Sequence, residues 1–294
     1  MFKYCYNLEN INLSSFDTTN AIDMSSMFDN CERLTSLDIS NFKTSNVRYM
    51  NYMFANCDKI STLDLNNFDT SNVTTMAGMF YGCKGLTNLN ININNFKTQK
   101  VTDMNRMFCG CALTSIDLSN FNTSVVKDMG EMFAGSSFIQ LNLNNFNTSQ
   151  VTNMSQMFNR CSKLTTLDIS SFDTQKVTMM TDMFSFCRSL TSLNLSNFDT
   201  SKVINMANMF EWCDKLTNLD LGSFNTSILA NTSYMFSRCT SLRTINLSKA
   251  VFTKVTNSSD MFDGTSNLTV KVKDEAAKTF LTSKLGSHGT AVIA

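Results

Sequence analysis

The segment Leu34–Lys59, LTSLDISNFKTSNVRYMNYMFANCDK, contains the pattern that decides the fold. Its first part, Leu34-x-x-Leu37-x-Ile39, ends in apolar–polar alternation and predicts a short strand. The Asn-Phe-x-Thr-Ser that follows predicts a turn, whose Thr44 or Ser45 would cap a helix. The next apolar residues have the spacing of one helical stripe; they are Val47, Met50, Met53, Phe54 and Cys57.

This unit is repeated along the chain at intervals of 25 to 28 residues. Two ladders of phenylalanine, one of them in Met-Phe pairs, contain 20 of the 24 Phe, and 19 of the 20 Met follow the same period. A single unit cannot bury its apolar stripe alone, so neighbouring units must stack and share one core. The sequence therefore predicts an α/β solenoid of about 10–11 repeats, each with a strand, a turn and a short helix.

Two regions follow from the extent of the repeat. Residues 1–270 are expected to form the solenoid, with a truncated first repeat because residues 1–7 match only the last part of a unit. Residues 271–294 are expected to form a strand and helix cap. Within it, residues 274–284 (DEAAKTFLTSK) predict a charged amphipathic helix, residues 286–289 a turn and residues 291–293 a last strand. The inward side chains of that helix are expected to be Ala276, Ala277, Phe280 and Leu281.

Composition argues against several classes of function. Lys and Arg number 24 and Asp and Glu also 24, so no net charge favours nucleic acid. The apolar runs are too short for a membrane-spanning helix, and no secretion leader or anchor pattern is seen. His288 is the one histidine, beside Ser287 in a predicted turn, which leaves little for acid–base catalysis. We expect neither an enzyme nor a bound cofactor.

The cysteines form a column with the period of the repeat. Spacings near 26 do not match a zinc site, and the one close pair, Cys109-x-Cys111, has no nearby partners. Ser136 and Thr265 take the same place in two units, so a small buried side chain is sufficient there. We expect buried free thiols that pack as small apolar groups.

A column of Asp and Asn is predicted on the outward face of the strands. Hydroxyl and amide side chains flank it, without Lys or Arg, and a second column of Asn and Thr at the turns is expected to satisfy backbone groups there. The outward column is either a solvated face or a surface that binds a protein or a glycan. Its members are Asp38, Asp64, Asn90, Asp117, Asn142, Asp168, Asn194, Asp220 and Asn246.

The period is broken between Asn90 and Gln140. A two-residue insertion at residues 91–93 keeps the alternation of faces, because strands have a period of two, and two one-residue deletions follow it. A bulge or a change of curvature is expected there. The stretch is either a specialised part of the surface or simple drift.

The unit LTSLNLSNFDTSKVINMANMFEWCDK, Leu190–Lys215, resembles the repeat of BspA-like leucine-rich-repeat bacterial surface proteins, also known as a repeat of unknown function common in mycoplasmas. The resemblance implies a right-handed, leucine-rich-repeat-like superhelix with a parallel sheet on one face and short helices on the other. It also implies a secreted or surface-anchored protein with a role in adhesion to host proteins or cells. It supplies no catalytic residues.

Two hypotheses for function remain. The chain is either an interaction module that binds a protein or glycan partner through its polar sheet face, or a passive stalk that presents another domain. The uniform columns favour the stalk, whereas the open solenoid surface and the resemblance favour the interaction module.

Overall fold

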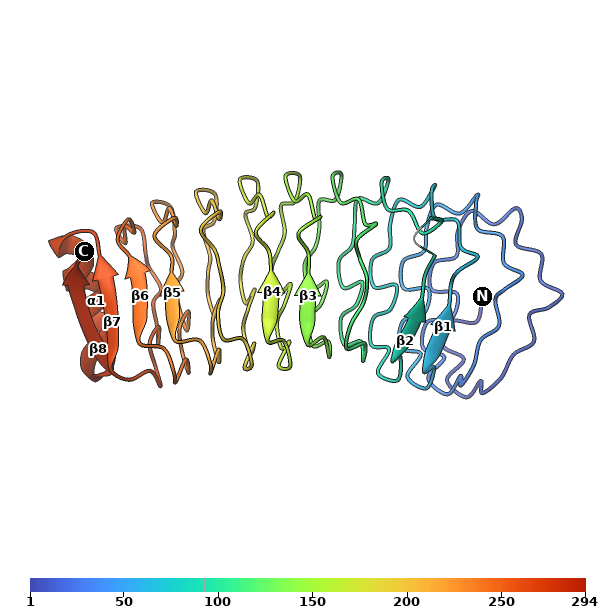
Figure 1. The fold of residues 1–294 in the computed structure, drawn as a ribbon, viewed down its shortest axis with the longest axis horizontal. Helices are drawn as coiled ribbons and strands as arrows, with labels where there is room; N and C mark the ends of the chain where they lie inside the picture. The colour runs from blue at the N-terminus through green and yellow to red at the C-terminus, as the bar shows by residue number, and fades with distance from the viewer. Residues whose placement is uncertain (93) are drawn as a thin grey trace. The chain divides into compact units, whose positions relative to one another are not determined.

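The computed structural model describes residues 1–92 and 94–294, which fall into two compact units, residues 1–138 and 139–294. Within each unit the backbone coils in successive turns of about 26 residues, here called rungs (Figure 1). Short parallel strands pair between neighbouring rungs. Each unit is therefore a parallel β-solenoid with few helices.

The first unit contains one pair of named strands. β1 (Thr62–Asp64) and β2 (Asn88–Asn90) are parallel, and Leu63 lies opposite Leu89 in their register. A second line of contact follows the turns of the same rungs through isolated parallel bridges, such as that between Tyr49 and Thr75. Neighbouring rungs are thus joined at the strands and again at the turns.

The second unit contains two sheets, both parallel. β3 (Gln140–Asn142) pairs with β4 (Thr166–Asp168). Further along the chain a four-stranded sheet has the order β5-β6-β7-β8. Its strands are β5 (Asn218–Asp220), β6 (Thr244–Leu247), β7 (Leu268–Val272) and β8 (Gly289–Ile293).

The core consists of the predicted phenylalanine and methionine ladders. Phe28, Phe54 and Phe80 are fully buried and stacked, with ring centroids 5.9 Å apart in both pairs and interplanar angles of 5° and 7°. Phe184 and Phe210 repeat this geometry in the second unit, at 5.8 Å and 8°. Stacked rings of this kind add attraction beyond the burial of their area. The prediction that both residue types face inward is confirmed.

The helix predicted from Val47 to Cys57 does not form. The apolar stripe is buried as expected, but the segment is a series of turns. The N–H of Ala55 donates to the carbonyl of Tyr52 in its own rung (3.2 Å), whereas the N–H of Tyr52 donates to the carbonyl of Ala77 in the next rung (2.8 Å). Alternate N–H groups therefore join the rungs, where an α-helix would use all of them internally.

Left-handed residues cause this departure from a helix. Tyr52 has φ +56° and Asn56 has φ +54°, and two such positions recur in the turns of the other rungs. A positive φ interrupts a right-handed helix and carries strain in any residue other than glycine. The hydrogen bonds between rungs offset that strain, and the spacing of apolar residues did not distinguish the turns from a helix.

The predicted column of turn threonines joins neighbouring rungs. The buried Thr44 hydroxyl donates to the carbonyl of Asp69 (3.0 Å) and accepts the N–H of the same residue (2.8 Å). Thr148 makes the same bond to the Asp173 carbonyl (2.8 Å) in the second unit. The expectation that these hydroxyls satisfy backbone groups is confirmed, but Thr44 does so between rungs and caps no helix.

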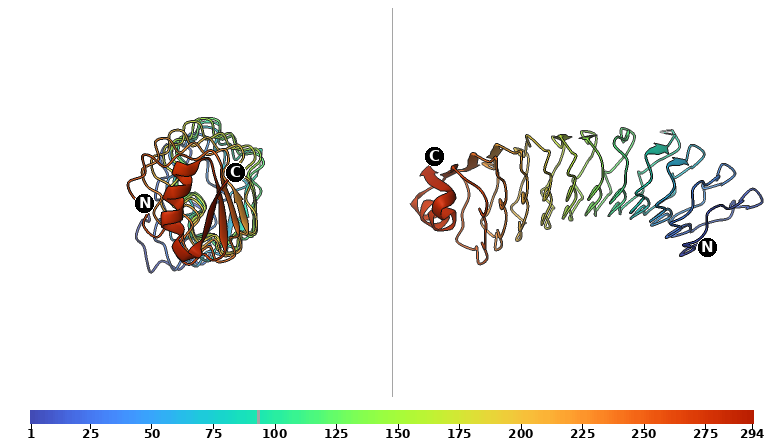
Figure 2. Two further views of the ribbon diagram at one scale, coloured as in Figure 1. Left: turned by 90° about the vertical axis from the view of Figure 1, so that its left-hand side faces the viewer. Right: turned by 90° about the horizontal axis from the view of Figure 1, so that it is seen from below.

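The C-terminal helix forms close to its predicted bounds. α1 (Glu275–Leu285) begins after Asp274, whose carboxylate accepts the Ala277 N–H at 2.9 Å, and lies against β8 (Figure 2). A single 3-10 turn, η1 (Gly286–His288), joins it to β8. The buried residues of α1 are Ala277, Leu281 and Leu285. The predicted Ala276 is exposed, and Phe280 is half-buried against Phe252.

Candidate functional site

The nine predicted residues lie on the outward side of the strands and form a column in each unit, here called the sheet face. Seven of them are exposed, and Asn90 and Asn246 are half-buried. The strand registers place Asp64 opposite Asn90, Asn142 opposite Asp168, and Asp220 opposite Asn246. Within each unit, neighbouring members of the column therefore lie side by side.

Most side chains of the sheet face also hold the turn that follows the strand. The Oδ1 atom of Asp168 accepts the N–H of Ser170 (3.1 Å) and the hydroxyl of the same residue (2.7 Å). This is an Asx turn, in which the side chain replaces a backbone acceptor. The backbone bond recurs between Asp38 and Ser40, Asp64 and Asn66, Asp117 and Ser119, Asn142 and Asn144, Asn194 and Ser196, Asp220 and Gly222, and Asn246 and Ser248.

The insertion changes this pattern at one rung. Asn92 accepts the N–H of Asn94 at 2.9 Å, so the Asx turn begins two residues beyond Asn90. Asn90 instead pairs in β2, where its carbonyl accepts the N–H of Leu65 (2.8 Å). Of the inserted segment that the sequence singles out, Ile93 lies outside the described residues.

Hydrogen bonding stabilises the ionised form of several carboxylates on this face. The Ser40 hydroxyl lowers the pKa of Asp38, and the Ser170 hydroxyl does the same for the pKa of Asp168. For Asp117 the pKa is lowered mainly by the Ser119 N–H. Each hydrogen bond favours the charged acceptor. These three carboxylates of the face therefore stay charged at neutral pH.

Hollows interrupt the sheet face in both units. One, of about 300 Å³, lies where Gly222 replaces a hydroxyl or amide residue of the flanking column, and its lining includes Asp220, Asn246 and Lys249. A Cβ built on Gly222 would lie 2.8 Å from Asn246 Nδ2 and 3.1 Å from Asp220 Oδ1, so this glycine keeps the hollow open. Lys249 places a positive charge beside the column of carboxylates and amides.

The other hollow lies in the first unit, beside the insertion. It measures about 270 Å³ and combines the polar Asn66 and Asp117 with the apolar Ile91 and Ile116. The sequence indicated this stretch as the place where the surface could be specialised. The structure brings two predicted residues of the sheet face, Asn90 and Asp117, to the same hollow.

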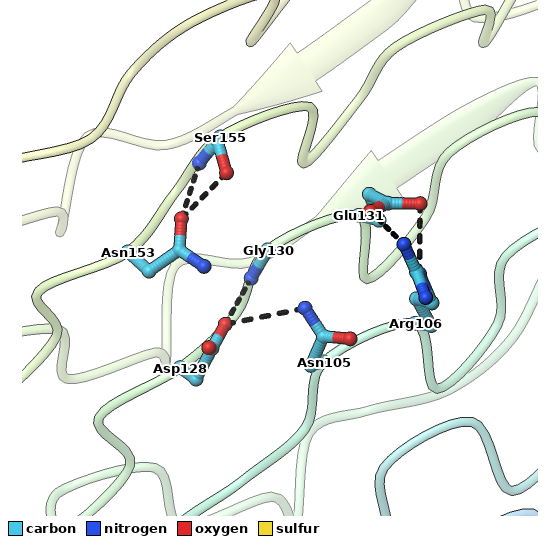
Figure 3. A network of polar contacts seen from close by, with 7 residues as sticks. All are labelled: Asn105, Arg106, Asp128, Gly130, Glu131, Asn153 and Ser155. Atoms are coloured by element: carbon cyan, nitrogen blue, oxygen red, sulfur yellow. Dashed lines mark hydrogen bonds and ion pairs between the residues drawn. The ribbon is translucent and has the colours of Figure 1, made fainter.

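Sequence reasoning missed a further column of Asx turns at the turn segment. Asp128 Oδ1 accepts the Gly130 N–H at 2.8 Å and also the Asn105 side chain at 3.4 Å (Figure 3). Asn153 and Ser155 repeat the Asx turn in the second unit, at 3.0 Å. One signal could have revealed this column: Asp or Asn recurs three residues before the first left-handed position of a turn segment. The residues are Asp23, Asp103, Asp128, Asn153, Asn205, Asn231 and Asn257.

An ion pair joins two rungs near this column. Arg106 donates to Glu131 through two nitrogens, at 2.9 Å and 2.6 Å (Figure 3). Both side chains are partly exposed, at 43% and 23%. A two-point arginine–carboxylate contact is the strongest geometry for such a pair, and here it joins neighbouring rungs of the first unit.

The cysteine column is structural. The Cys57 thiol donates to the carbonyl of Phe28 (3.3 Å) and the Cys83 thiol to that of Phe54 (3.0 Å), each in the preceding rung. Burial raises the pKa of the Cys31 thiol to about 11 and that of Cys239 to about 12. A thiol with a raised pKa is a poor nucleophile. The expectation of buried free thiols is confirmed for eight of the ten cysteines.

His288 makes a contact that fits a structural role. Its Nδ1 atom lies 3.0 Å from the carbonyl oxygen of Thr265. Within the described residues, no group of three or more His, Cys, Asp or Glu side chains is arranged to hold a metal ion. In the same part of the chain, no helix has the length and apolar content needed to cross a membrane.

Three solved structures are similar to this chain at low identity. A leucine-rich repeat protein from Bacteroides ovatus is 19% identical, with a TM-score of 0.48, and the match covers 77% of this chain and 58% of that protein. The pneumococcal vaccine antigen PcpA is 13% identical over 90% of this chain and 78% of its own, with a TM-score of 0.35. The functional domain of InlJ from Listeria monocytogenes, which includes a cysteine ladder, is 12% identical over 90% and 69%, with a TM-score of 0.16.

The sequence comparisons agree with the repeat. No curated protein matches the chain. One family model matches it three times in tandem, over residues 1–108, 84–190 and 160–274, and its description is "Mycoplasma protein of unknown function, DUF285". These matches cover nearly the whole chain and confirm the mycoplasma-type repeat expected from the unit Leu190–Lys215. The chain belongs to the DUF285 family of mycoplasma proteins.

Proposed function

We propose that this chain is a non-catalytic interaction module that binds a protein or glycan partner through its sheet face. The observation that carries the proposal is the exposed column itself. Seven of its nine members are exposed, and each unit adds a hollow bordered by them. Solenoids use extended surfaces of this kind to bind partners.

The chemistry of the face favours a polar partner. Each Asx turn uses Oδ1 of the aspartate, and the second carboxylate oxygen remains an acceptor for a ligand. Hydroxyl and amide groups flank these acceptors and supply donors. A glycan or a protein with exposed amines and hydroxyls would match this surface, whereas a polyanion would be repelled.

An enzymatic role has little support in the described residues. His288 contacts a backbone carbonyl, and burial raises the pKa of thiols such as those of Cys57 and Cys83. Catalysis needs a nucleophile and a base within hydrogen-bond reach of one another. We therefore propose a non-enzymatic protein.

A location outside the cell belongs to the same proposal. It rests on the resemblance to BspA-like surface proteins, which also implies a right-handed superhelix and a role in adhesion. This chain spans 58% of the length of the Bacteroides ovatus protein.

The Asx turns also support the alternative of a passive stalk. Eight of the nine column members hold a turn, a role that would retain Asp and Asn without any ligand. A substitution that breaks the turn would not distinguish the interaction module from the stalk, because it removes the local structure together with the charge. The test must therefore remove charge alone.

Asparagine substitutions achieve this, since Asn142 and Asn194 already form the same turn. The sheet-face variant combines Asp117→Asn, Asp168→Asn and Asp220→Asn. The matched control removes three carboxylates from Asx turns of another column, through Asp69→Asn, Asp173→Asn and Asp199→Asn.

Wild type and both variants are applied to a printed array of extracellular-matrix proteins and glycans. We expect wild type and control to bind the same spots, and the sheet-face variant to lose them. A wild type that binds no spot, or a sheet-face variant that binds every spot as well as the control does, would leave the stalk as the function.

A further inference from the structure

One column of the second unit departs from the rest of the repeat. In the first unit the second left-handed position is Tyr4 in the first rung and Gly or Asn in the five rungs that follow: Asn30, Asn56, Gly82, Gly110 and Gly135. In four successive rungs of the second unit it is a large side chain, with φ between 58° and 61°; these are Arg160, Phe186, Trp212 and Arg238. Large side chains pay backbone strain at such positions, and at this column only the second unit places them in successive rungs.

These side chains stack on one another across the rungs. The rings of Phe186 and Trp212 lie 5.9 Å apart at an angle of 18°. The Arg160 guanidinium lies 4.9 Å from the Phe186 centroid, and that of Arg238 lies 5.7 Å from Trp212. Arg188 lies over both rings, at 5.4 Å and 4.6 Å. We call these five residues the Arg–aromatic ladder.

The exposed charges of the Arg–aromatic ladder are positive. All three arginines are exposed, whereas the nearby carboxylates of Asp182, Glu211 and Asp214 are half-buried. Burial raises the pKa of these three carboxyl groups, and the arginines act against that rise. The guanidinium groups therefore lie nearer to an approaching ligand than the carboxylates do.

Two of the arginines keep their donors available. Arg238 is paired with Asp263 at 3.0 Å. Across residues 1–92 and 94–294, no carboxylate oxygen lies within 4.0 Å of a side-chain nitrogen of Arg160 or Arg188. A guanidinium that stacks on a ring is held in one plane and keeps its N–H edge for a two-point bond to a carboxylate.

The stacking also indicates which class of anion fits. Arg160 and Trp212 come from the rungs on either side of Phe186, so both faces of that ring are covered; Phe186 and Arg238 cover Trp212 in the same way. A sugar that stacks on an aromatic ring needs an open face. A peptide needs only ring edges and guanidinium edges, and Trp and Arg are among the residues enriched in the hot spots near the centres of protein interfaces.

We propose that the Arg–aromatic ladder is a docking surface for an acidic segment of a partner protein, separate from the sheet face. Carboxylates of the segment bind the free edges of Arg160 and Arg188. The edges of Phe186 and Trp212 supply the apolar contact between them.

Trp212 makes this surface directly measurable, because it is the single tryptophan of the chain. The full chain is titrated at low ionic strength with acetylated, amidated hexaglutamate while Trp212 emission is followed. Hexalysine tests the sign of the charge, and hexagalacturonate tests an acidic glycan. We expect a saturable change with hexaglutamate, none with hexalysine, and weaker binding of hexagalacturonate.

Charge-removing variants locate the binding. Arg160→Gln combined with Arg188→Gln should weaken hexaglutamate binding by about tenfold or more. Arg48→Gln, which removes an exposed arginine from the first unit, should leave it unchanged. Circular dichroism and the melting temperature verify that each variant is folded. Arg160→Gln alone, which retains Arg188 over both rings, gives the same comparison if the double variant unfolds.

Three results would overturn the proposal. One is the lack of any saturable change with hexaglutamate. Another is tighter binding of hexagalacturonate, which would assign the ladder to an acidic glycan. The last is an equal loss in Arg48→Gln, which would show diffuse attraction to the whole surface.

Discussion

The ring of Tyr52 lies directly over the backbone of Gly78, the corresponding residue of the next rung. A Cβ built on Gly78 would lie 2.9 Å from Cζ of that ring and closer still to Cε1 and Cδ1. Gly78 also has φ +59°, a conformation that other residues adopt only with strain. Glycine at this position avoids the backbone strain that Tyr52 carries and leaves room for the aromatic ring of its neighbour.

Replacing Gly78 with alanine should lower the free energy of unfolding more than the same change at Gly135. Gly135 has a similar φ of +63°, but its nearest neighbours are 3.9 Å from the added Cβ, so only backbone strain of about 1 kcal/mol is expected. Gly78→Ala should lose about 1–3 kcal/mol more, because the Tyr52 ring must move. Urea unfolding of the two variants measures the difference, and equal losses would show that the ring moves without cost.

The buried threonine column should contribute strongly to stability. Thr174 is 1% exposed, donates to the Asp199 carbonyl (2.9 Å) and accepts its N–H (2.8 Å). Thr174→Val leaves both backbone groups without that partner and should cost about 1–3 kcal/mol in urea unfolding.

Thr178→Val is the control for this experiment. Thr178 is exposed, and its hydroxyl donates one long hydrogen bond, to the Thr152 carbonyl at 3.3 Å. Its loss should stay below about 0.5 kcal/mol. Similar losses in the two variants would contradict the role assigned to the buried hydroxyl.

The sequence predicted the core well because burial depends mainly on which residues recur. Any coil with a fixed period places Phe54 and Met53 on the same side of each rung, whether the backbone between them is a helix or a turn. The helix was predicted wrongly for the same reason. Offsets of three and four residues fit both structures, and only the positive φ of Tyr52 and Asn56 separates them.

Alternation along the strands located the sheet face, but the hydrogen bonds from its side chains to the following turn were not visible in the sequence. Alternation places Asp168 outward, and the bond from the Ser170 N–H depends on the path of the backbone after the strand. The Arg–aromatic ladder was missed because Phe186 and Trp212 follow neither phenylalanine ladder. Their column is recognisable only once the left-handed positions are known.

Replacing Asp103 with asparagine should stabilise the protein at neutral pH. Burial raises the pKa of this half-buried carboxyl, and the charge of Asp128 in the next rung adds to the rise. Asparagine has no charge, and its Oδ1 can still accept the Asn105 N–H, which lies 2.9 Å from Oδ1 of Asp103. The gain should be about 0.5–1 kcal/mol at pH 7.

The sign of the pH dependence follows from the raised pKa of Asp103. The ionised carboxylate is disfavoured in the fold, so its cost is present above the folded pKa and disappears as the pH falls below the unfolded value. The stability gained by Asp103→Asn should therefore shrink in acid.

Asp117→Asn should instead lower the stability at neutral pH, because the pKa of Asp117 is lowered in the fold and its charge stabilises the folded state there. Melting temperatures at pH 7 and pH 3 test both, and a destabilised Asp103→Asn at pH 7 would contradict the assignment.

The cysteine column should resist thiol reagents until the protein unfolds. Cys5 and Cys109 are half-buried and the other eight cysteines are buried. Burial raises the pKa of Cys109 and of Cys111 to about 11, so little thiolate is present at pH 8 even where the reagent has access.

Ellman's reagent should detect at most two slowly reacting thiols in the native protein and ten in guanidinium chloride. Cys109→Ser should remove one of the native thiols and Cys187→Ser none, since the buried Cys187 donates to the Phe158 carbonyl at 3.1 Å. Rapid native reaction of more than two thiols would mean that the rungs open far more readily than their stacked phenylalanines and shared hydrogen bonds allow.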